Sequence, residues 1–201
     1  LYYVEDFGRY TLLGQTLDDA AGEAFDKVAK ISGMGYPGGV AIEKASREGR
    51  HDGVKFPRAY MSKTSLDFSF SGLKTAVSLF LNKWRDDSVL NAEISLNDIV
   101  ASFQEAVVDV LVDKVMVAAK RMGVASVVLA GGVACNNHLR KSLVETSAPE
   151  GIRVYYPRPA YCTDNGAMIA LTGYHRFKRN DATHMAVDVR AKYPIQDLMS
   201  E

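Results

Sequence analysis

Residues 127–140, which read VVLAGGVACNNHLR, decide the fold of this chain. The first four residues form an apolar run bounded by two glycines, a pattern typical of a central strand in a parallel sheet, covered on both faces. Gly131 and Gly132 let the backbone approach a ligand, and Asn136 and Asn137 stand where a helix begins. A helix N-terminus favours phosphate or other polar groups. The stretch predicts either a nucleotide site or only a tight strand-to-helix turn.

The composition is that of an ordinary globular protein. Of the 201 residues, 47% are hydrophobic and 24% are charged, which is enough for a sizeable core. The 24 basic and 24 acidic residues balance, so any contact with RNA must be local. No apolar run approaches the roughly 18 residues of a membrane span. The two cysteines form no CxxC pair, which indicates reduced thiols. We expect a cytoplasmic protein without membrane association.

Periodicity places other elements around the 127–140 stretch. Ser95 and Asp98 form a capping-box-like start to a long helix that ends at Gly123 and leads into the strand. A helix at 137–146 and a short strand at 153–156 follow, giving the helix–strand order of a parallel α/β sheet. At the other end of the chain, LYYVED and RYTLLGQ predict a hairpin.

A helix from about residue 18 to residue 32 carries three carboxylates on one stripe. Asp19, Glu23 and Asp26 recur at positions i, i+4 and i+7. The stripe is either a solvated face or a row that accepts hydrogen bonds from ribose hydroxyls or an amine. Asp18, like Asp19, suits the helix dipole and is expected to be structural.

Glycines follow this helix. The run Tyr-Pro-Gly-Gly at 36–39 predicts a turn with positive φ, either a flexible connection or a binding loop. A short helix is expected at 41–48, followed by a polar loop. His51 in that loop is expected to be a surface residue rather than a metal ligand.

Two further helix starts carry polar groups. In DFSFSGLKT, Ser71 is expected to cap a helix whose first turn contains Lys74, either solvated or facing an anion. In CTDNGAM, Thr163 is expected to cap a helix with Asp164 in its first turn. Asp164 is either a dipole partner or a metal ligand at the carboxyl edge of the sheet.

The motifs together resemble one family. DDAAGEAFDK, YPGG, DFSFSGLKT, AGGVACNNHLR, CTDNGAMIA and AVDVRAKYP occur in this order and extend over nearly the whole chain. They are similar to the tRNA threonylcarbamoyladenosine transferases, called TsaD in bacteria and Kae-type proteins in archaea and eukaryotes. The same family has been named O-sialoglycoprotein endopeptidase or glycoprotease. The bacterial branch fits best.

The resemblance implies the α/β fold of actin and hexokinase, in which two ribonuclease-H-like lobes hold a nucleotide. Residues 1–201 are expected to be the second, C-terminal actin-like ATPase lobe, with a mixed sheet, flanking helices and a helical insertion at about 40–95. The N-terminal lobe, the SGGHT loop and the HxxxH metal pair are expected to be absent from this chain. The four histidines, at positions 51, 138, 175 and 184, form no HxxxH pair.

The resemblance also implies roles for individual residues. Asp164 matches a carboxylate ligand of a divalent metal, iron or zinc, that two histidines outside this chain complete. Asp26, Gly39 and Asn136 match positions that hold threonylcarbamoyl-AMP or ATP. Glu43 falls where many relatives have Asp and is expected to contact the ribose. The catalytic residues are unknown from the sequence.

The implied reaction moves the threonylcarbamoyl group from threonylcarbamoyl-AMP to N6 of adenosine 37 in tRNAs that read codons beginning with A. The implied partners are tRNA, a paralogous actin-like (TsaB-like) subunit, an ATPase (TsaE-like) subunit and the enzyme that forms the adenylate. With one metal ligand of three, the 201 residues alone are expected to be inactive.

Two alternatives remain open from the sequence. A metal-dependent glycoprotein endopeptidase agrees with the older family name, but the chain has no HExxH motif and no convincing nucleophile and base. A non-catalytic nucleotide-binding assembly module is the second alternative, since actin-like lobes also act as interaction platforms.

Overall fold

The computed structural model describes residues 1–60, 64–180 and 195. Helices and strands alternate only in the second half of the chain. In chain order the elements are β1 (Tyr2–Asp6), β2 (Arg9–Leu12), α1 (Ala21–Ile31), α2 (Gly38–Ser46), α3 (Ser71–Asp86), α4 (Ser88–Glu93), α5 (Leu96–Met122), β3 (Ser126–Val128), η1 (Gly132–Cys135), α6 (Asn137–Ser147), η2 (Ala148–Glu150), β4 (Arg153–Tyr155), η3 (Pro159–Tyr161) and α7 (Gly166–Lys178).

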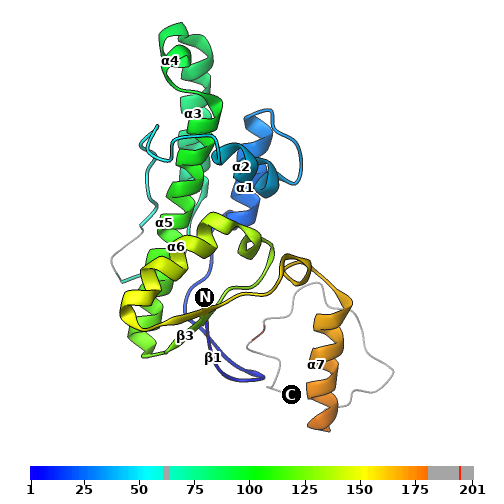
Figure 1. Ribbon diagram of the computed structural model, residues 1–201. Helices are drawn as coiled ribbons and strands as arrows, with labels where there is room; N and C mark the ends of the chain where they lie inside the picture. Colours follow the sequence, from blue (N-terminus) through cyan, green and yellow to red (C-terminus); the bar gives the residue numbers. More distant parts are fainter. Residues whose placement is uncertain (61–63, 181–194, 196–201) are drawn as a thin grey trace.

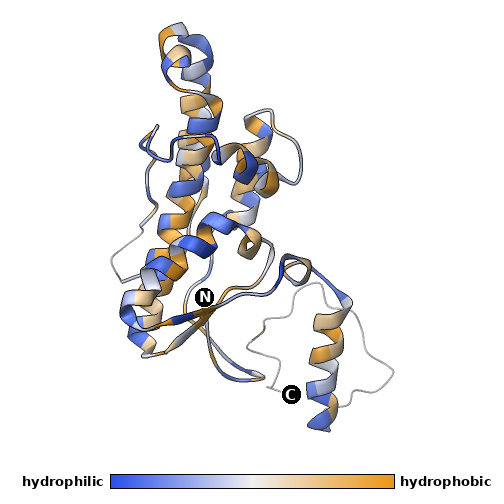
Figure 2. Ribbon diagram, in the orientation of Figure 1, coloured by the Kyte–Doolittle hydropathy of each residue, from blue (hydrophilic) through white to orange (hydrophobic). Residues whose placement is uncertain are grey.

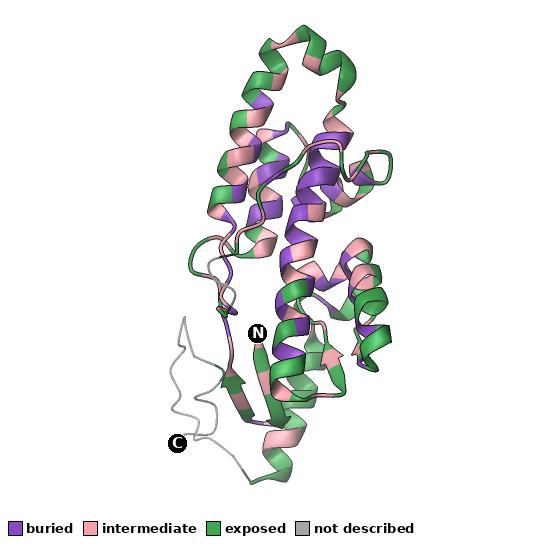
Figure 3. Cartoon of the chain, turned by 90° about the vertical axis from the view of Figure 1, so that its left-hand side faces the viewer, coloured by how far each residue is buried: buried purple, intermediate pink, exposed green. Residues whose placement is uncertain are grey.

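Helix α5 runs through the centre of the molecule. Helix α3 leads to α4 at one tip, and α5 returns from there toward the small strands (Figure 1). Helices α1 and α2 pack against the first half of α5, and α6 packs against its second half. Burial is concentrated along α5, whereas the hairpin and α7 are largely exposed (Figure 3).

The ends of α5 confirm the sequence prediction. The Ser95 hydroxyl accepts a hydrogen bond of 3.1 Å from the Asp98 amide, and Asp98 Oδ2 accepts one of 2.9 Å from the Ser95 amide. These two bonds are a capping box. Gly123 ends the helix with a φ of +64°, which glycine adopts without steric cost. No helix among the described residues is long and apolar enough to span a membrane.

Two hydrophobic clusters share α5. The first cluster joins α1, α2 and α3 to the first half of α5, with Phe25 and Phe103 in edge contact at 5.3 Å between ring centroids. The second cluster joins α6 and the β3–β4 strands to the second half, around Val112 and Leu143. Over its first half, from residue 98 to residue 108, α5 is buried on almost all sides.

The strands form two separate pairs within the described residues. Strands β1 and β2 are antiparallel, with Tyr2 opposite Leu12, which confirms the predicted hairpin. Strands β3 and β4 are parallel, with Val127 opposite Val154. A single parallel bridge also joins Thr16 to Phe68.

The prediction of a central strand at 127–130 is wrong in one respect. Val127 and Leu129 pack on the second cluster, but Val128 between them is 70% exposed. Only alternate side chains face the core, because α5 and α6 cover one side of the β3–β4 pair. The apolar run is therefore a half-buried strand in a two-stranded sheet.

Helix starts differ from the sequence predictions. Helix α1 begins at Ala21 rather than near residue 18, and α2 begins at Gly38 rather than at 41. Gly38 and Gly39 are the first residues of α2 and do not have positive φ, which belongs instead to Gly33 at +73°. The predicted turn at 36–39 is therefore a helix start.

Asp18, rather than Ser71, caps helix α3. Its Oδ1 atom accepts hydrogen bonds from the Phe70 and Ser71 amides at 2.9 and 3.3 Å. Its Oδ2 atom accepts hydrogen bonds from the Ser69 and Ser71 hydroxyls at 2.5 and 2.6 Å. Ser71 is the first residue of α3 and donates to this carboxylate. Asp18 is structural, as expected, but for another helix.

Helix α7 lies apart from both clusters. Asn165, not Thr163, caps it by accepting a hydrogen bond of 3.0 Å from the Met168 amide. The His175 ring stacks on Phe7 of the hairpin with ring centroids 4.6 Å apart. Apolar residues lie along α7 (Figure 2), and several of them are exposed, with Ile169 at 72%.

We expect Asp18→Asn to destabilise the chain by about 1–2 kcal/mol at neutral pH, because the charged cap of α3 is lost. Partial desolvation raises the pKa of Asp18, but the four hydrogen bonds outweigh it and lower this pKa to about 2. Because the folded-state pKa lies below the unfolded value of about 3.9, the stabilisation is present above pH ~4 and disappears as the pH falls toward 2.

Urea unfolding at several pH values tests this prediction. The stability difference between the wild-type chain and Asp18→Asn should shrink as the pH falls from about 5 to 2.5. Glu145→Gln is the control, since Glu145 is an exposed helix carboxylate that lies 3.9 Å from Lys141 on the same helix. A pH-independent difference would contradict the role of the Asp18 charge.

Candidate functional site

Asp26 connects α1 to the start of α2. Its Oδ1 atom accepts a hydrogen bond of 2.8 Å from the Gly38 amide. A Cβ atom on Gly38 would lie 2.6 Å from the Asp26 Cα atom, so glycine is required for this approach. Gly39 follows directly and has open space where a side chain would stand. Two of the predicted adenylate-binding residues thus lie together at the α1–α2 junction.

Glu43 connects α2 to α6. Its Oε1 atom accepts hydrogen bonds from the Asn137 amide at 3.1 Å and from the Asn137 side chain at 2.6 Å. Arg47 lies 3.7 Å from the same oxygen. The Asn137 amide is the first N–H of α6, so a carboxylate already occupies the position where the helix dipole favours an anion.

Asn136 is buried and both ends of its side-chain amide are occupied. Its Oδ1 atom accepts a hydrogen bond of 2.9 Å from the Leu139 amide and so caps α6. Its Nδ2 atom donates to Gln104 Oε1 on α5 at 2.7 Å. Asn136 therefore fixes α6 on α5, which is a positioning contact, and its contact with the adenylate stays a prediction.

The loops after β3 and β4 lie side by side, as parallel strands require. Arg140 of α6 donates to the Ala134 carbonyl at 2.5 Å and to the Pro157 carbonyl at 3.1 Å. Its guanidinium also lies 3.4 Å from Cys162 Sγ. Asp164 follows two residues later and is exposed. Asp164 precedes the cap of α7, so it is not in the first turn of that helix.

Four of the five predicted site residues lie on or beside the contacts that join α1 to α2 and α2 to the start of α6. The Asp26 contact joins α1 to α2, and the Glu43 contact joins α2 to α6. A Cβ atom on Gly22 of α1 would touch the Val133 side chain at 3.4 Å, which brings η1 to the same place. Asp164 is the one predicted residue outside this group.

The carboxylate stripe on α1 does not act as a unit. Lys27 Nζ lies 2.6 Å from Asp19 Oδ1 and 2.8 Å from Glu23 Oε1, so two of the three carboxylates share one cation. Only Asp26 turns toward α2. Asp19 and Glu23 therefore belong to an ion-paired surface, whereas Asp26 accepts a backbone hydrogen bond from α2 and its contact with a ligand stays a prediction.

The structure also brings together a group that the sequence did not predict. His51 Nδ1 and His138 Nε2 both contact Glu105 Oε2, at 2.8 and 2.6 Å. His51 follows α2, Glu105 lies on α5 and His138 lies in the first turn of α6. No sequence spacing links these residues, because the contact depends on the packing of three separate elements.

Asp164 alone does not fit a metal site. The three residues just named are the one group of metal-ligating side chains found within the described part of the chain, and Asp164 is not among them. A stable transition-metal site usually requires three or four converging ligands. His184 lies outside the described residues.

Comparison with known proteins decides the family. Residues 1–171 match the TsaD family, described as tRNA N6-adenosine threonylcarbamoyltransferase. The chain belongs to the TsaD family. The motif resemblance is thereby confirmed, since this match extends from the β1–β2 hairpin into α7.

Individual TsaD relatives carry the same name, tRNA N6-adenosine threonylcarbamoyltransferase. The protein of Desulfitobacterium hafniense is 52% identical over 181 residues, which are 90% of this chain and 52% of that relative. The protein of Geotalea uraniireducens is 46% identical over 200 residues, 100% of this chain and 57% of the relative. The protein of Syntrophus aciditrophicus is 47% identical over 195 residues, 97% and 56% respectively. The chain spans about half the length of these curated relatives.

We expect Asn136→Ala to lower the free energy of unfolding by about 2–4 kcal/mol, because it removes a helix cap and leaves Gln104 buried without its partner. Asn136→Ser should recover the part due to the cap. Urea unfolding of the single variants, Gln104→Ala and the double variant measures the coupling between the two side chains. Additive effects would show that the Asn136–Gln104 hydrogen bond contributes nothing.

Proposed function

We propose that this chain contributes the adenosine-binding half of a tRNA N6-adenosine threonylcarbamoyltransferase. The family match over residues 1–171 carries the proposal. The grouping of Asp26, Gly39 and Glu43 at one junction supports it, because these are the positions at which the family resemblance places the adenylate. The lobe is proposed to be the second actin-like lobe of a two-lobe protein.

The junction favours the ribose end of the adenylate over its phosphate. Carboxylates accept hydrogen bonds, and ribose hydroxyls donate them. Asp26 Oδ1 and Glu43 Oε1 are both partly buried and already accept N–H donors, so their orientation is fixed before a ligand arrives. Glu43 at the N-terminus of α6 repels a phosphate placed there. In this proposal the phosphate lies away from α6.

The proposed reaction is an acyl transfer. N6 of adenosine 37 attacks the carbamoyl carbon of threonylcarbamoyl-AMP, a C–N bond forms, the C–O bond to phosphate breaks, and AMP leaves as N6 loses a proton. The contribution of this chain is to hold the adenylate in a fixed orientation while tRNA presents the amine. Gly39 leaves open space for close approach of the ligand.

Further partners belong to the proposal rather than to the structure. Asp164 is proposed to supply one oxygen to an iron or zinc ion completed by histidines from the rest of the protein. The TsaB-like and TsaE-like subunits and the adenylate-forming enzyme complete the proposed cytoplasmic system. The 201 residues assayed alone are expected to give no turnover.

The decisive test uses a two-part protein. A chimera joins this chain to the part of the Desulfitobacterium hafniense relative that it does not cover, in a strain whose own gene is depleted. Mass spectrometry of digested tRNA should show restored N6-threonylcarbamoyladenosine, and Asp164→Ala should abolish it. A folded chimera that restores none of the modified nucleoside would refute the proposed function.

Calorimetric titration of the same chimera with a stable adenylate analogue tests the binding role. We expect Glu43→Gln to weaken binding by about 10- to 100-fold, the effect of losing a charge-assisted hydrogen bond worth about 1.5–3 kcal/mol. Glu23→Gln is the matched control, because Glu23 lies on α1 and is bonded to Lys27 rather than to α2 or α6. Equal affinities for the two variants would exclude Glu43 from the site.

A further inference from the structure

A compact group of potential metal ligands consists of His51, Glu105 and His138. It lies outside the adenylate junction, the name used here for Asp26, Gly39 and Glu43 at the contacts of α1, α2 and α6. The three ligand atoms, His51 Nδ1, Glu105 Oε2 and His138 Nε2, lie within 4.8 Å of one another. The two imidazole rings are 4.6 Å apart between centroids and tilted by 40°. We propose that these three residues bind one divalent first-row transition metal ion, with Zn²⁺ as the best match.

The donor set suits such an ion. Two imidazole nitrogens and one carboxylate oxygen, with a fourth position open to water, are ligands that zinc accepts in tetrahedral geometry. Ligand atoms around a tetrahedral zinc lie about 3.3–3.4 Å apart, since each bond is about 2.0–2.1 Å long. The present distances from Glu105 Oε2 are 2.8 Å to His51 and 2.6 Å to His138. Each of these two distances must lengthen by about 0.5–0.8 Å to reach the tetrahedral separation.

The loop that carries His51 is fixed to α5 on both sides of the histidine. The Arg50 amide donates to Asp98 Oδ1 at 2.7 Å, and the Arg50 guanidinium pairs with the same carboxylate at 3.2 Å. The Val54 amide donates to the Ser102 hydroxyl at 2.9 Å, and that hydroxyl donates to the Arg50 carbonyl at 3.2 Å. These bonds hold His51 beside α5 without any help from a metal.

The other two ligands are held by the Asn136 contacts. Glu105 follows Gln104, whose side chain accepts the 2.7 Å hydrogen bond from Asn136. His138 lies between the cap Asn136 and the buried Leu139. Because α5 and α6 are joined next to both ligands, the site is organised in advance, which lowers the entropic cost of binding an ion.

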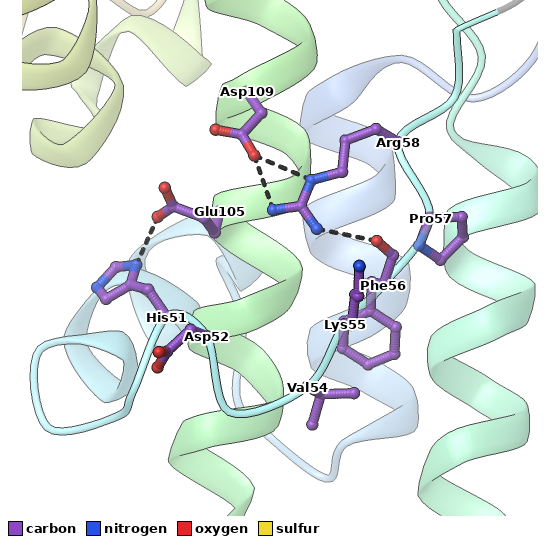
Figure 4. A pocket seen from close by; sticks show the side chains of 9 residues that line it. All are labelled: His51, Asp52, Val54, Lys55, Phe56, Pro57, Arg58, Glu105 and Asp109. Carbon is purple, nitrogen blue, oxygen red and sulfur yellow. Dashed lines mark hydrogen bonds and ion pairs between the residues drawn. The ribbon is translucent and has the colours of Figure 1, made fainter.

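The site is open to solvent on one side. The side chains of His51, His138 and Glu105 are 38%, 25% and 27% exposed, so an ion and a coordinated water can reach them. His51 and Glu105 also line a surface groove of about 890 Å³ (Figure 4). Arg58 in this groove is bound to Asp109 at 2.7 Å and to the Phe56 carbonyl at 2.9 Å.

Calorimetric titration of the untagged 201-residue chain with Zn²⁺ tests the proposal. The absorption spectrum of the Co²⁺-substituted chain shows the coordination geometry and the type of ligand atom. We expect one ion per chain and a tetrahedral Co²⁺ spectrum without the near-ultraviolet band of a thiolate ligand. His51→Ala, His138→Ala and Glu105→Gln should each weaken binding at least tenfold. His175→Ala and Cys135→Ser are the controls and should leave the affinity unchanged.

Circular dichroism and thermal melting of each variant separate loss of the site from loss of the fold. Because Glu105→Gln keeps the size of the side chain and its ability to accept a hydrogen bond, it should fold normally and still lose the ion. Absence of one-to-one Zn²⁺ binding by the folded wild-type chain would overturn the proposal. Binding that persists in a folded His51→Ala, His138→Ala or Glu105→Gln variant, or that Cys135→Ser removes, would overturn it as well.

Discussion

The structure depends on the burial of α5. This helix has 27 residues, about 40 Å at 1.5 Å per residue, and contacts both hydrophobic clusters. Asp98 at its start accepts hydrogen bonds from Ser95 and from Arg50, so one carboxylate both begins the helix and fixes the loop after α2. Those contacts hold the pKa of Asp98 well below its usual range: desolvation raises it, but the hydrogen bonds outweigh that effect. The charged form is thus part of the fold.

Both polar regions of the molecule are built on this helix. The Asn136–Gln104 hydrogen bond joins α6 to α5 and sets the position of Glu43 relative to Asn137 and of His138 relative to Glu105. A shift of α6 along α5 would therefore alter the adenylate junction and the His–Glu–His group together. Buried polar contacts of this kind are costly when half-satisfied, which keeps α6 in one register.

The sequence predicted the helices and hairpin well, because periodicity, the Ser95 capping box and Gly123 are local signals. It failed where distant chain segments meet. Asp18 caps a helix more than 50 residues away, and within the described residues the 127–130 run has one neighbouring strand. The family motifs selected Asp26, Gly39, Glu43 and Asn136, which the fold places on neighbouring elements. The contact between His51 and Glu105, by contrast, follows only from the packing of separate elements. Residue spacing carries no signal for such a contact.

The adenylate junction and the His–Glu–His group differ in what they accept. At the junction, carboxylates from α1 and α2 receive N–H groups, so a ligand must offer donors or displace a backbone partner. In the other group, one Glu105 oxygen contacts a ring nitrogen of each of two histidines, and a bound metal ion would take the place of these two contacts. Arg58 in the neighbouring groove is ion-paired with Asp109 at 2.7 Å. As proposed above, the first group suits a nucleoside and the second a cation, and one chain can hold both because their side chains come from different elements.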